Sequence, residues 1–364
     1  MKNIIIIVFA VLLFSQFVDA KVDPFNTYRW NRENVQNSSS RTQKGNWYEW
    51  WYYKVVIPET KESFFFVYGV VNPQDTHKQL KGTRSYVGMG DFTAKEQVEH
   101  TVSIDDFHAK YDRTYVEVDG HIATDKNLTG NLTSEEGKNY YWDISVQRNW
   151  TFNATGWATG KNITNIEWYP AQADATCNGV IESNGKLYHL VDAPCYQDRN
   201  WGSSFPKWWT WIVSNHFKGH PETSIAIGGG HPKYFNRNLP LKGVAVGLRH
   251  KGKVYDFRPN DFDKVKIDIN FGKWEVIAED KNYRLEISAT APKSSFMDLQ
   301  FMTPTGEIFH DYETLTGKLT VKIFKKKGFI VRKWVLEETL YSDLAGIEYG
   351  SREVKEIFNI KAKL

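Results

Sequence analysis

From Trp47 onward the chain consists mainly of short apolar runs of alternating polarity, separated by Gly, Asn, Asp and Pro. Alternation with a period of two puts successive side chains on opposite faces of an extended strand, and those four residue types mark turns. Few stretches keep a 3.6-residue period for long enough to form a helix. Regular strand spacing with Gly-containing turns such as Lys251-Gly252-Lys253 is typical of barrels and sandwiches, so we predict an all-β protein.

The clearest predicted strands are Ser63 to Val71, Tyr115 to His121, Tyr141 to Gln147, Leu187 to Asp192, Val244 to Arg249, Val254 to Phe257, Lys264 to Asn270, Trp274 to Ala278, Arg284 to Thr290, Lys318 to Phe324 and Lys333 to Leu340. The length of 364 residues favours two domains. The strand rhythm breaks between Arg199 and Pro206, which places a provisional boundary between domains at 21–206 and 207–364.

Aromatic residues make up 15% of the chain, including 14 Trp, which is more than an ordinary core needs and indicates a roomy aromatic pocket. The net charge is only +3, and Lys and Arg are spread along the chain apart from the run Lys325 to Lys327. Nucleic-acid binding therefore receives no support.

The N-terminus has the features of a secretory signal peptide. Lys2 precedes an apolar stretch from Ile4 to Phe14, and Val18-Asp19-Ala20 supplies small residues suited to signal peptidase. We predict a signal peptide at 1–20 and a protein that is secreted or lies in the lumen of the secretory pathway. An uncleaved anchor is the weaker alternative, because the apolar stretch is shorter than the roughly 20 residues that a membrane-spanning helix needs.

Six Asn-x-Ser/Thr sequons lack proline, and five of them fall within one segment, which predicts a glycosylated surface. They begin at Asn37, Asn127, Asn131, Asn149, Asn153 and Asn162.

Cys177 and Cys195 are the only cysteines, and a secretory route permits a disulfide between them. The sequence from Val180 to Tyr188 predicts a hairpin with a type I′ turn at Asn184-Gly185, which brings the cysteines near each other. The register centred on that turn puts Cys177 opposite Asp192 and not Cys195. The disulfide therefore requires looser strand pairing at the ends of the hairpin. Two free buried thiols are the alternative.

The first aromatic cluster is Trp47-Tyr48-Glu49-Trp50-Trp51-Tyr52-Tyr53-Lys54, on a predicted strand. Glu49, Trp51 and Tyr53 share one face of such a strand. If that face looks inward, desolvation raises the pKa of Glu49 and equips it as a general acid. The alternative is that Glu49 pairs with a buried Arg and only shapes the core.

The second cluster runs from Asp192 to Phe217. Trp209 and Trp211 share one face of a strand that ends near Asn215, and Trp faces stabilise a nearby cation. Plain core packing is the alternative. Asp198 is a second candidate acid, and its neighbour Arg199 points to the opposite side of a strand, which disfavours a direct pair.

These residues carry a resemblance to a known family. Three motifs closely resemble those of the tocopherol cyclase family. They are Glu49-x-Trp51-Tyr52-x-Lys54, then Asp192-Ala193-Pro194-x-Tyr196-x-Asp198-x-Asn200-Trp201-Gly202-x-x-Phe205-Pro206-x-x-Trp209-x-Trp211, and finally Asn215-x-Phe217. Ile225 to Gly230, Gly252 to Tyr255 and Gly346 to Gly350 also fall where that family has similar strands. Two differences are that Asp198 stands where relatives often carry Glu, and Trp50 where they often carry Gly.

The resemblance implies two tandem lipocalin-like β-barrel or sandwich domains and an acid-initiated cyclisation of a prenylated aromatic or isoprenoid lipid, without metal or other cofactor. It favours Glu49 and Asp198 as acids. The residues expected to bind the substrate are Trp51, Tyr53, Tyr196, Trp201, Trp209, Trp211 and Asn215.

Two other functions are compatible with the same sequence. A noncatalytic lipocalin-like carrier of a hydrophobic ligand is the main alternative, and a glycosylated structural protein is the third. Either lipid function leaves peripheral membrane contact possible. The ten His residues show no zinc-type spacing, so we predict no metal.

Overall fold

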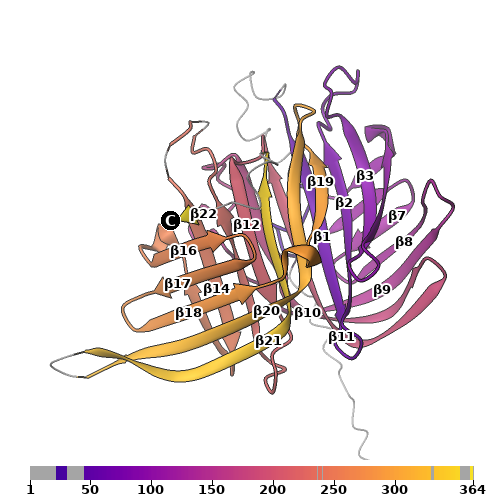
Figure 1. The fold of residues 1–364 in the computed structure, drawn as a ribbon. Helices are drawn as coiled ribbons and strands as arrows, with labels where there is room; N and C mark the ends of the chain where they lie inside the picture. The colour runs from indigo at the N-terminus through magenta and orange to yellow at the C-terminus, as the bar shows by residue number, and fades with distance from the viewer. Residues whose placement is uncertain are drawn as a thin grey trace, which may run out of the picture.

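The computed structural model describes residues 22–30, 45–235, 237–239, 241–328, 332–352 and 361–363. Its long elements are all β-strands, arranged in two antiparallel sheets of eleven strands each. Figure 1 shows the sheets side by side, the first in indigo to magenta and the second in red to yellow. The prediction of an all-β protein built from two tandem units is confirmed.

The first sheet is ordered β4-β3-β2-β1-β11-β10-β9-β8-β7-β6-β5. Its strands are β1 (Tyr48–Ile57), β2 (Glu62–Val71), β3 (Arg84–Asp91), β4 (Glu96–Val102), β5 (Phe107–Ala109), β6 (Tyr115–Val118), β7 (His121–Thr124), β8 (Asn127–Thr133), β9 (Asn139–Trp150), β10 (Ile166–Ser183) and β11 (Lys186–Gly202).

The second sheet is ordered β15-β14-β13-β12-β21-β20-β18-β17-β16-β22, with β19 paired to β20. Its strands are β12 (Trp208–Ser214), β13 (Ser224–Gly230), β14 (Gly243–His250), β15 (Lys253–Phe257), β16 (Lys264–Asn270), β17 (Lys273–Glu279), β18 (Tyr283–Thr290), β19 (Met297–Met302), β20 (Ile308–Lys327), β21 (Lys333–Ser351) and β22 (Lys361–Lys363).

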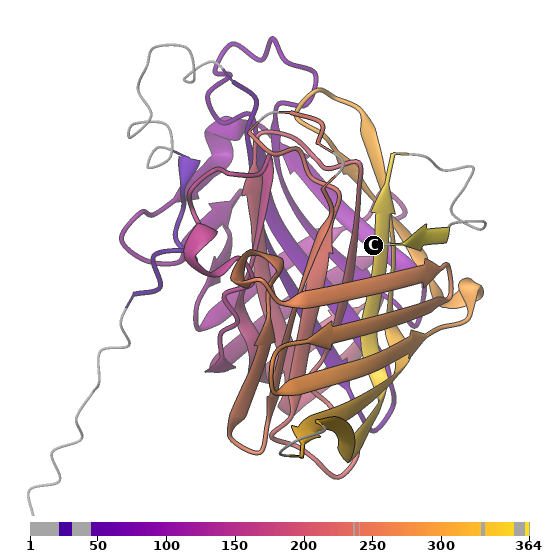
Figure 2. The same ribbon diagram turned by 90° about the vertical axis from the view of Figure 1, so that its left-hand side faces the viewer.

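Both sheets are built on the same plan. The first strand of each lies between its second strand and a long later one, β1 between β2 and β11, and β12 between β13 and β21. Both also curl strongly, so that β2 contacts β6 and β14 contacts β16, and Figure 2 shows β16 to β18 running across β12 to β14. The chain passes from one sheet to the other between Gly202 and Trp208; the domain limits 21–206 and 207–364 stay predictions.

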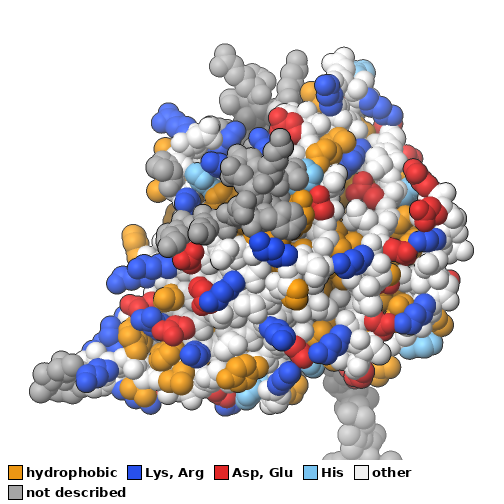
Figure 3. Space-filling view, viewed as in Figure 1, with side chains coloured by type: hydrophobic (Ala, Val, Ile, Leu, Met, Phe, Trp, Pro, Cys, Tyr) orange, Lys and Arg blue, Asp and Glu red, His pale blue; other side chains and the backbone are white. Residues whose placement is uncertain are grey.

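Within the described ranges, four 3-10 turns join the strands, at Ile104–Asp106, Gly156–Ala158, Pro259–Asp261 and Lys293–Ser295. The described part of the chain contains no helix with the length and apolar character needed to cross a bilayer. On the face seen in Figure 3, basic and acidic side chains are interspersed rather than gathered into one patch.

The central strands are buried on both faces, which explains their near-continuous aromatic sequence. Trp51 and Tyr53 of β1 point into the core inside the first curled sheet, whereas Trp50 and Tyr52 point into a second core between the two sheets. The first strand of the second sheet behaves in the same way, with Ile212 facing its own sheet's core and the Trp209 and Trp211 side chains facing the core between the sheets. Alternation along a strand therefore decides which side chains reach the space between the sheets.

Candidate active site

A cavity of about 500 Å³ lies between the two sheets. This volume is in the range typical of small-molecule sites. Loop residues within 154–164, 232–234, 241–242 and 259–260 contribute to its lining along with the strands. The aromatic side chains that line it are Trp50, Tyr52, Trp157, Trp168, Trp209, Trp211, Tyr234 and Phe301.

Glycines on β21 make room for two of these rings. A Cβ atom at Gly346 would lie 2.3 Å from the Trp211 ring, and one at Gly350 would lie 2.3 Å from Nε1 of Trp209. Real Cβ atoms do not approach other atoms so closely, so any side chain at these positions would push the cavity tryptophans aside. The Gly346 to Gly350 motif of the sequence thus shapes the aromatic wall of the cavity.

Asp198 of β11 lines the cavity from the first sheet. Its Oδ2 atom accepts hydrogen bonds from Nε1 of Trp168 and from the hydroxyl of Tyr196, both at 2.7 Å. Trp211 in turn donates from Nε1 to the Tyr196 hydroxyl at 3.1 Å. Burial outweighs these hydrogen bonds and raises the pKa of Asp198 to about 7. The structure therefore places Asp198, Trp209 and Trp211 in the cavity wall, with Tyr196 hydrogen-bonded to Asp198 and Trp211, while the roles of these residues stay predictions.

Three further carboxyl groups line the same cavity from the second sheet, and the sequence analysis missed all three. They belong to Asp311 and Glu313 on β20 and Glu348 on β21. Trp209 Nε1 donates a hydrogen bond to Asp311 at 3.0 Å, and the Tyr52 hydroxyl donates one to Glu313. Burial raises the pKa of each of the three groups. Alternation could have found Asp311 and Glu313, since they share a strand face with the apolar Phe309 and Leu315.

Three buried acids outside the cavity each have a cationic partner. Glu49 is paired with Arg199, Asp174 with Arg249 and Asp23 with Arg148. In the part of the chain that the structure describes, no ion pair involves Asp198, Asp311, Glu313 or Glu348. A neutral, protonated carboxyl is the form that burial favours when no cation is at hand.

Glu49 lies outside the cavity, and its prediction as a cavity acid is corrected. Its carboxylate forms an ion pair with Arg199 and accepts hydrogen bonds from the Arg29 backbone N–H at 3.0 Å and from Trp47 Nε1 at 3.1 Å. Desolvation raises the pKa of Glu49, while the Arg199 charge and the hydrogen bonds oppose that rise. Glu49 thus pairs with a buried Arg, which was the alternative to a role as an acid.

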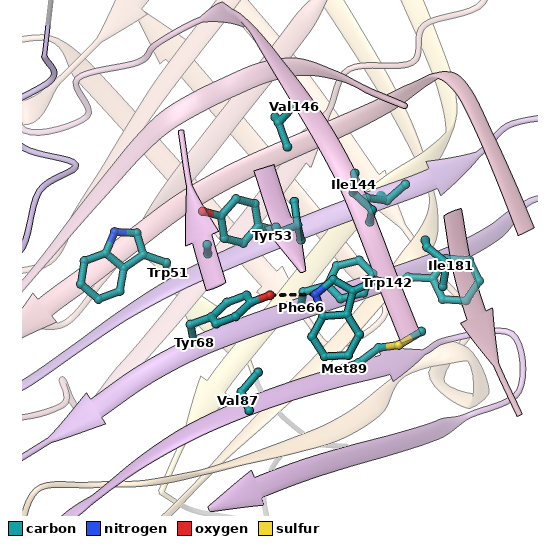
Figure 4. Packing of buried hydrophobic residues seen from close by; sticks show 14 of the residues in the cluster. Trp51, Tyr53, Phe66, Tyr68, Val87, Met89, Trp142, Ile144, Val146 and Ile181 are labelled. Atoms are coloured by element: carbon teal, nitrogen blue, oxygen red, sulfur yellow. Dashed lines mark hydrogen bonds between the residues drawn. The ribbon is translucent and has the colours of Figure 1, made fainter. Parts of the chain in front are cut away.

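Trp51 and Trp201 belong to the same ion-pair cluster and not to the cavity. The Arg199 guanidinium stacks over both rings, 4.6 Å from the centroid of Trp51 and 4.7 Å from that of Trp201. Tyr53 points into the core of the first sheet, where Figure 4 shows it near Trp51, Phe66 and Tyr68. Their placement as substrate-binding residues is therefore corrected, because they lie on the face of their strands that looks away from the cavity.

Asn215 also lies outside the cavity. Its amide donates hydrogen bonds to the Cys195 carbonyl at 2.7 Å, the Ala175 carbonyl at 3.2 Å and Asp174 at 3.2 Å. These contacts tie the end of β12 to the hairpin of β10 and β11, so Asn215 joins the two sheets rather than facing a ligand.

Cys177 and Cys195 form a disulfide, as predicted, with Cα atoms 5.8 Å apart. The Asn184-Gly185 turn has positive φ at both residues, 50° and 80°, in keeping with type I′. The predicted register holds as far as Gly179, but a bulge then shifts it by one residue and places Cys177 opposite Ala193. The irregular pairing at the bulge therefore meets the requirement for the disulfide.

The sequons at Asn127, Asn131 and Asn149 lie on exposed strand positions, and those at Asn153 and Asn162 are half-buried. Asn37 and the signal peptide at 1–20 lie outside the described residues. Glycosylation itself stays a prediction.

Two clusters in the described residues have donor atoms close enough to share a metal ion, namely His220, Glu222 and His250, and the cavity group of Asp311, Glu313 and Glu348. Sequence spacing did not reveal the first, because the fold brings together two His that are thirty positions apart. His250 is already engaged, with its ring nitrogens 2.6 Å from the Thr223 hydroxyl and 2.9 Å from Glu338.

Comparison with known proteins decides the family. The sequence model of the tocopherol cyclase-like family matches residues 45–351, which include every strand except β22 and every cavity carboxyl. This chain belongs to the tocopherol cyclase-like family. Among its relatives, a probable chloroplastic tocopherol cyclase of Oryza sativa subsp. japonica is 25% identical over 359 residues, covering 83% of this chain and 75% of that protein. The chloroplastic tocopherol cyclase of Zea mays is 25% identical over 357 residues, covering 83% and 74%.

Two solved structures are similar to this tocopherol cyclase-like protein. A putative AttH from Nitrosomonas europaea gives a TM-score of 0.47 at 11% identity, covering 88% of this chain and 96% of that one. Kievitone hydratase from Nectria haematococca gives a TM-score of 0.42 at 13% identity, covering 84% and 90%.

Proposed function

We propose that this tocopherol cyclase-like protein cyclises a prenylated aromatic or other isoprenoid lipid by proton transfer from Asp198, without a cofactor. The observation that carries the proposal is the position of Asp198, whose carboxyl lines an aromatic cavity without a cationic partner and has its pKa raised to about 7. A carboxyl that keeps its proton near neutral pH is what a general acid needs. Family membership and the names of the relatives support a lipid substrate.

In the proposed reaction, the Asp198 proton adds to a prenyl double bond and leaves a tertiary carbocation on the substrate. The phenol oxygen of the same molecule attacks that cation and closes the ring. The phenol proton then returns to the Asp198 carboxylate, so the reaction is an isomerisation with no net change in atoms or electrons. The cavity rings, including Trp168 and Trp211, would stabilise the cation through their faces and exclude water.

The test is to incubate the purified protein with prenylated quinols and identify products by mass spectrometry. We expect Asp198→Asn to lose product formation by about 10²-fold or more, the usual contribution of a general acid, while Asp198→Glu retains it because the relatives often carry Glu there. Unchanged product formation in Asp198→Asn would remove Asp198 from the mechanism. Ligand bound and recovered unchanged by the wild type would favour the carrier function instead.

We also propose that the protein acts in the secretory pathway or outside the cell. The predicted signal peptide, the sequons and the Cys177–Cys195 disulfide support this location. Peptide sequencing of the mature N-terminus and glycosidase digestion of the native protein test it. A mature chain that still begins with Met1 and does not change mass on digestion would contradict it.

A projecting hairpin supports the proposal of peripheral membrane contact. Beyond the pair Tyr283 and Lys325, β20 and β21 pair only with each other, as far as Lys327 and Lys333, and Figure 1 shows this hairpin extending from the body. Leu336 is 49% exposed on its edge strand. Lysines beside exposed apolar residues suit an anionic lipid surface.

Sedimentation with phosphatidylcholine vesicles, with and without phosphatidylserine, tests this contact. We expect binding only to the anionic vesicles, and its loss in Lys325→Glu/Lys327→Glu. Lys264→Glu/Lys266→Glu on β16 makes the same charge change elsewhere on this sheet and serves as the control. Equal loss in both variants would show a dependence on net charge alone and would contradict a docking role for the hairpin.

A further inference from the structure

Glu313 of β20 and Glu348 of β21 stand directly opposite each other. Asp311 lies two positions before Glu313 on the same face of β20. Carboxylate oxygens of all three residues lie within 4.8 Å of one another. Like charges directly opposite each other in a sheet are destabilising, and burial in an apolar wall makes the repulsion larger. The fold nevertheless places all three groups in the wall of one cavity.

The surroundings of this carboxyl triad (Asp311, Glu313 and Glu348) leave room for a cation. Asp311 and Glu313 are 2% and 1% exposed, so bulk water does not screen them. Lys54, whose charge acts on Glu313, is fully buried, and its Nζ has no hydrogen-bond partner among the described residues. Lys54 acts on Glu313 only through space, and it does not line the cavity.

Three carboxyls at this distance cannot all be ionised in a dry wall, so they share protons when the cavity is empty. A positively charged ligand would replace a shared proton and satisfy the same oxygens. The rings of Trp50, Trp209 and Phe301 line the same cavity and offer their faces to such a cation. Carboxylates and aromatic faces together form an environment for a cation that carries no hydrogen-bond donor.

We propose that Asp311, Glu313 and Glu348 form a cation subsite that stabilises the positive charge created on the substrate when Asp198 donates its proton. The inference rests on the proposed function and extends it, because it assigns the second sheet the task of stabilising charge and the first sheet the task of donating the proton. No covalent bond to the triad forms or breaks. A stable organic cation of similar shape, such as a quaternary ammonium, should therefore bind better than its neutral isostere.

Binding of a cation should also depend on pH, in a direction that the triad fixes. Because the cation displaces a proton, its affinity rises with pH, by up to about tenfold per pH unit for each proton released. The ionisable groups that act on the triad from the surrounding strands are Tyr52, Lys54, Asp198 and Asp298. Asp198 also loses its proton as pH rises, so the variants below separate its contribution from that of the triad.

The experiment compares benzyltrimethylammonium with neopentylbenzene, in which carbon replaces the charged nitrogen. Tryptophan fluorescence gives both affinities at pH 6, 7 and 8, and calorimetry in phosphate and Tris buffers counts protons released. We expect the ammonium to bind more tightly at every pH, to gain affinity as pH rises and to release protons, while the neutral compound shows no pH dependence. Equal affinities for the two compounds, or no proton release, would overturn the proposal.

Glu313→Gln/Glu348→Gln keeps the shape of the wall and removes two ionisable groups. We expect this variant to lose the preference for the ammonium while it still binds neopentylbenzene, which also reports that the cavity is folded. Glu275→Gln, an exposed carboxyl on the same sheet, is the matched control and should change nothing. If the double variant does not fold, Glu348→Gln and the proton count on the wild type still decide the matter.

Two further arms separate alternative outcomes. Asp198→Asn should retain the preference for the ammonium, and loss of that preference would assign the subsite to Asp198 rather than to the triad. Calcium or magnesium that displaces the ammonium would make the triad a metal site and overturn the proposal. These titrations involve no turnover, so the cation subsite can fail while product formation persists, and the cyclisation can fail while the ammonium still binds.

Discussion

Glu49 and Asp198 are buried carboxyls on neighbouring strands with opposite chemical settings. Glu49 faces Arg199 within an ion pair that two tryptophans enclose, whereas Asp198 faces an aromatic cavity and two hydrogen-bond donors. Arg199 follows Asp198 in sequence but points to the other side of the strand. The same alternation therefore supplies Glu49 with its partner and leaves Asp198 without one.

This difference predicts which variant unfolds the protein. Glu49→Gln leaves the fully buried Arg199 without a counter-charge, so we expect the free energy of unfolding to fall by about 3–5 kcal/mol. Glu49→Gln/Arg199→Met should recover part of that loss. Urea unfolding measures both, with Asp198→Asn as a control that changes stability less. Full stability of Glu49→Gln combined with lost product formation would return Glu49 to the list of chemical candidates.

The rate of product formation should fall as pH rises through about 7. With its pKa raised to about 7, Asp198 is protonated below that pH and loses its proton above it. Above pH 7 the rate should fall toward tenfold per unit, since only the acid form donates. Initial rates between pH 5.5 and 8.5 measure the profile. A rate that increases over this range would indicate that Asp198 works as a base.

At the scale of elements, the long hairpin of β10 and β11 connects the disulfide to the site. Cys195 and Asp198 lie on the same strand, and the hydrogen bonds of Asn215 tie that strand to the end of β12. The bulge near Cys177 sets the register of the hairpin on its way to the cavity. The hairpin thus carries the acid, its cross-link and a contact to the second sheet.

Removing the disulfide should weaken the fold. The two cysteines are 18 residues apart, and closing a loop of that size in the unfolded chain corresponds to about 3 kcal/mol. We expect Cys177→Ser/Cys195→Ser to lose about that much in guanidinium unfolding. Reduction of the wild type should produce a similar loss, and the variant should not respond to reductant. A variant as stable as the oxidised wild type would show that the bond contributes little.

At the scale of the whole molecule, two sheets with the same arrangement around their first strands, β1 and β12, face each other across one aromatic core. The cavity lies within that core, and each sheet contributes acids to it: Glu167 and Asp198 from the first, and Asp311, Glu313 and Glu348 from the second. A site built between two sheets exists only when both are folded and docked.

Stability should fall as pH rises from about 4 to above 7. The raised pKa values of Asp198 and the triad mean that the folded state holds protons that the unfolded chain releases. Their stabilisation is complete below the unfolded pKa values near 4 and is lost as pH passes the folded ones, by up to about 1.4 kcal/mol per pH unit for each group.

Urea unfolding at pH 5.5, 6.5 and 7.5 measures this dependence. Glu313→Gln/Glu348→Gln should flatten it, because the variant removes two of the groups. Acids with lowered pKa values, such as Glu62 and Glu96, act below about pH 4.5 and outside this window. Stability that rises over the range would contradict the protonated state of the cavity acids.

The sequence by itself determined the strand class, the hairpin at Asn184-Gly185 and the family, and it named Asp198, Trp209 and Trp211, which line one cavity. Each of these follows from local alternation, turn chemistry or residues close in sequence. Only the tertiary structure decided which face of β1 meets the cavity, since a strand buried on both sides has two aromatic faces and no polar one to mark the outside. It also decided that Arg199 neutralises Glu49 and that Asp311, Glu313 and Glu348 join Asp198, because contacts between residues more than 100 positions apart depend on how the two sheets dock.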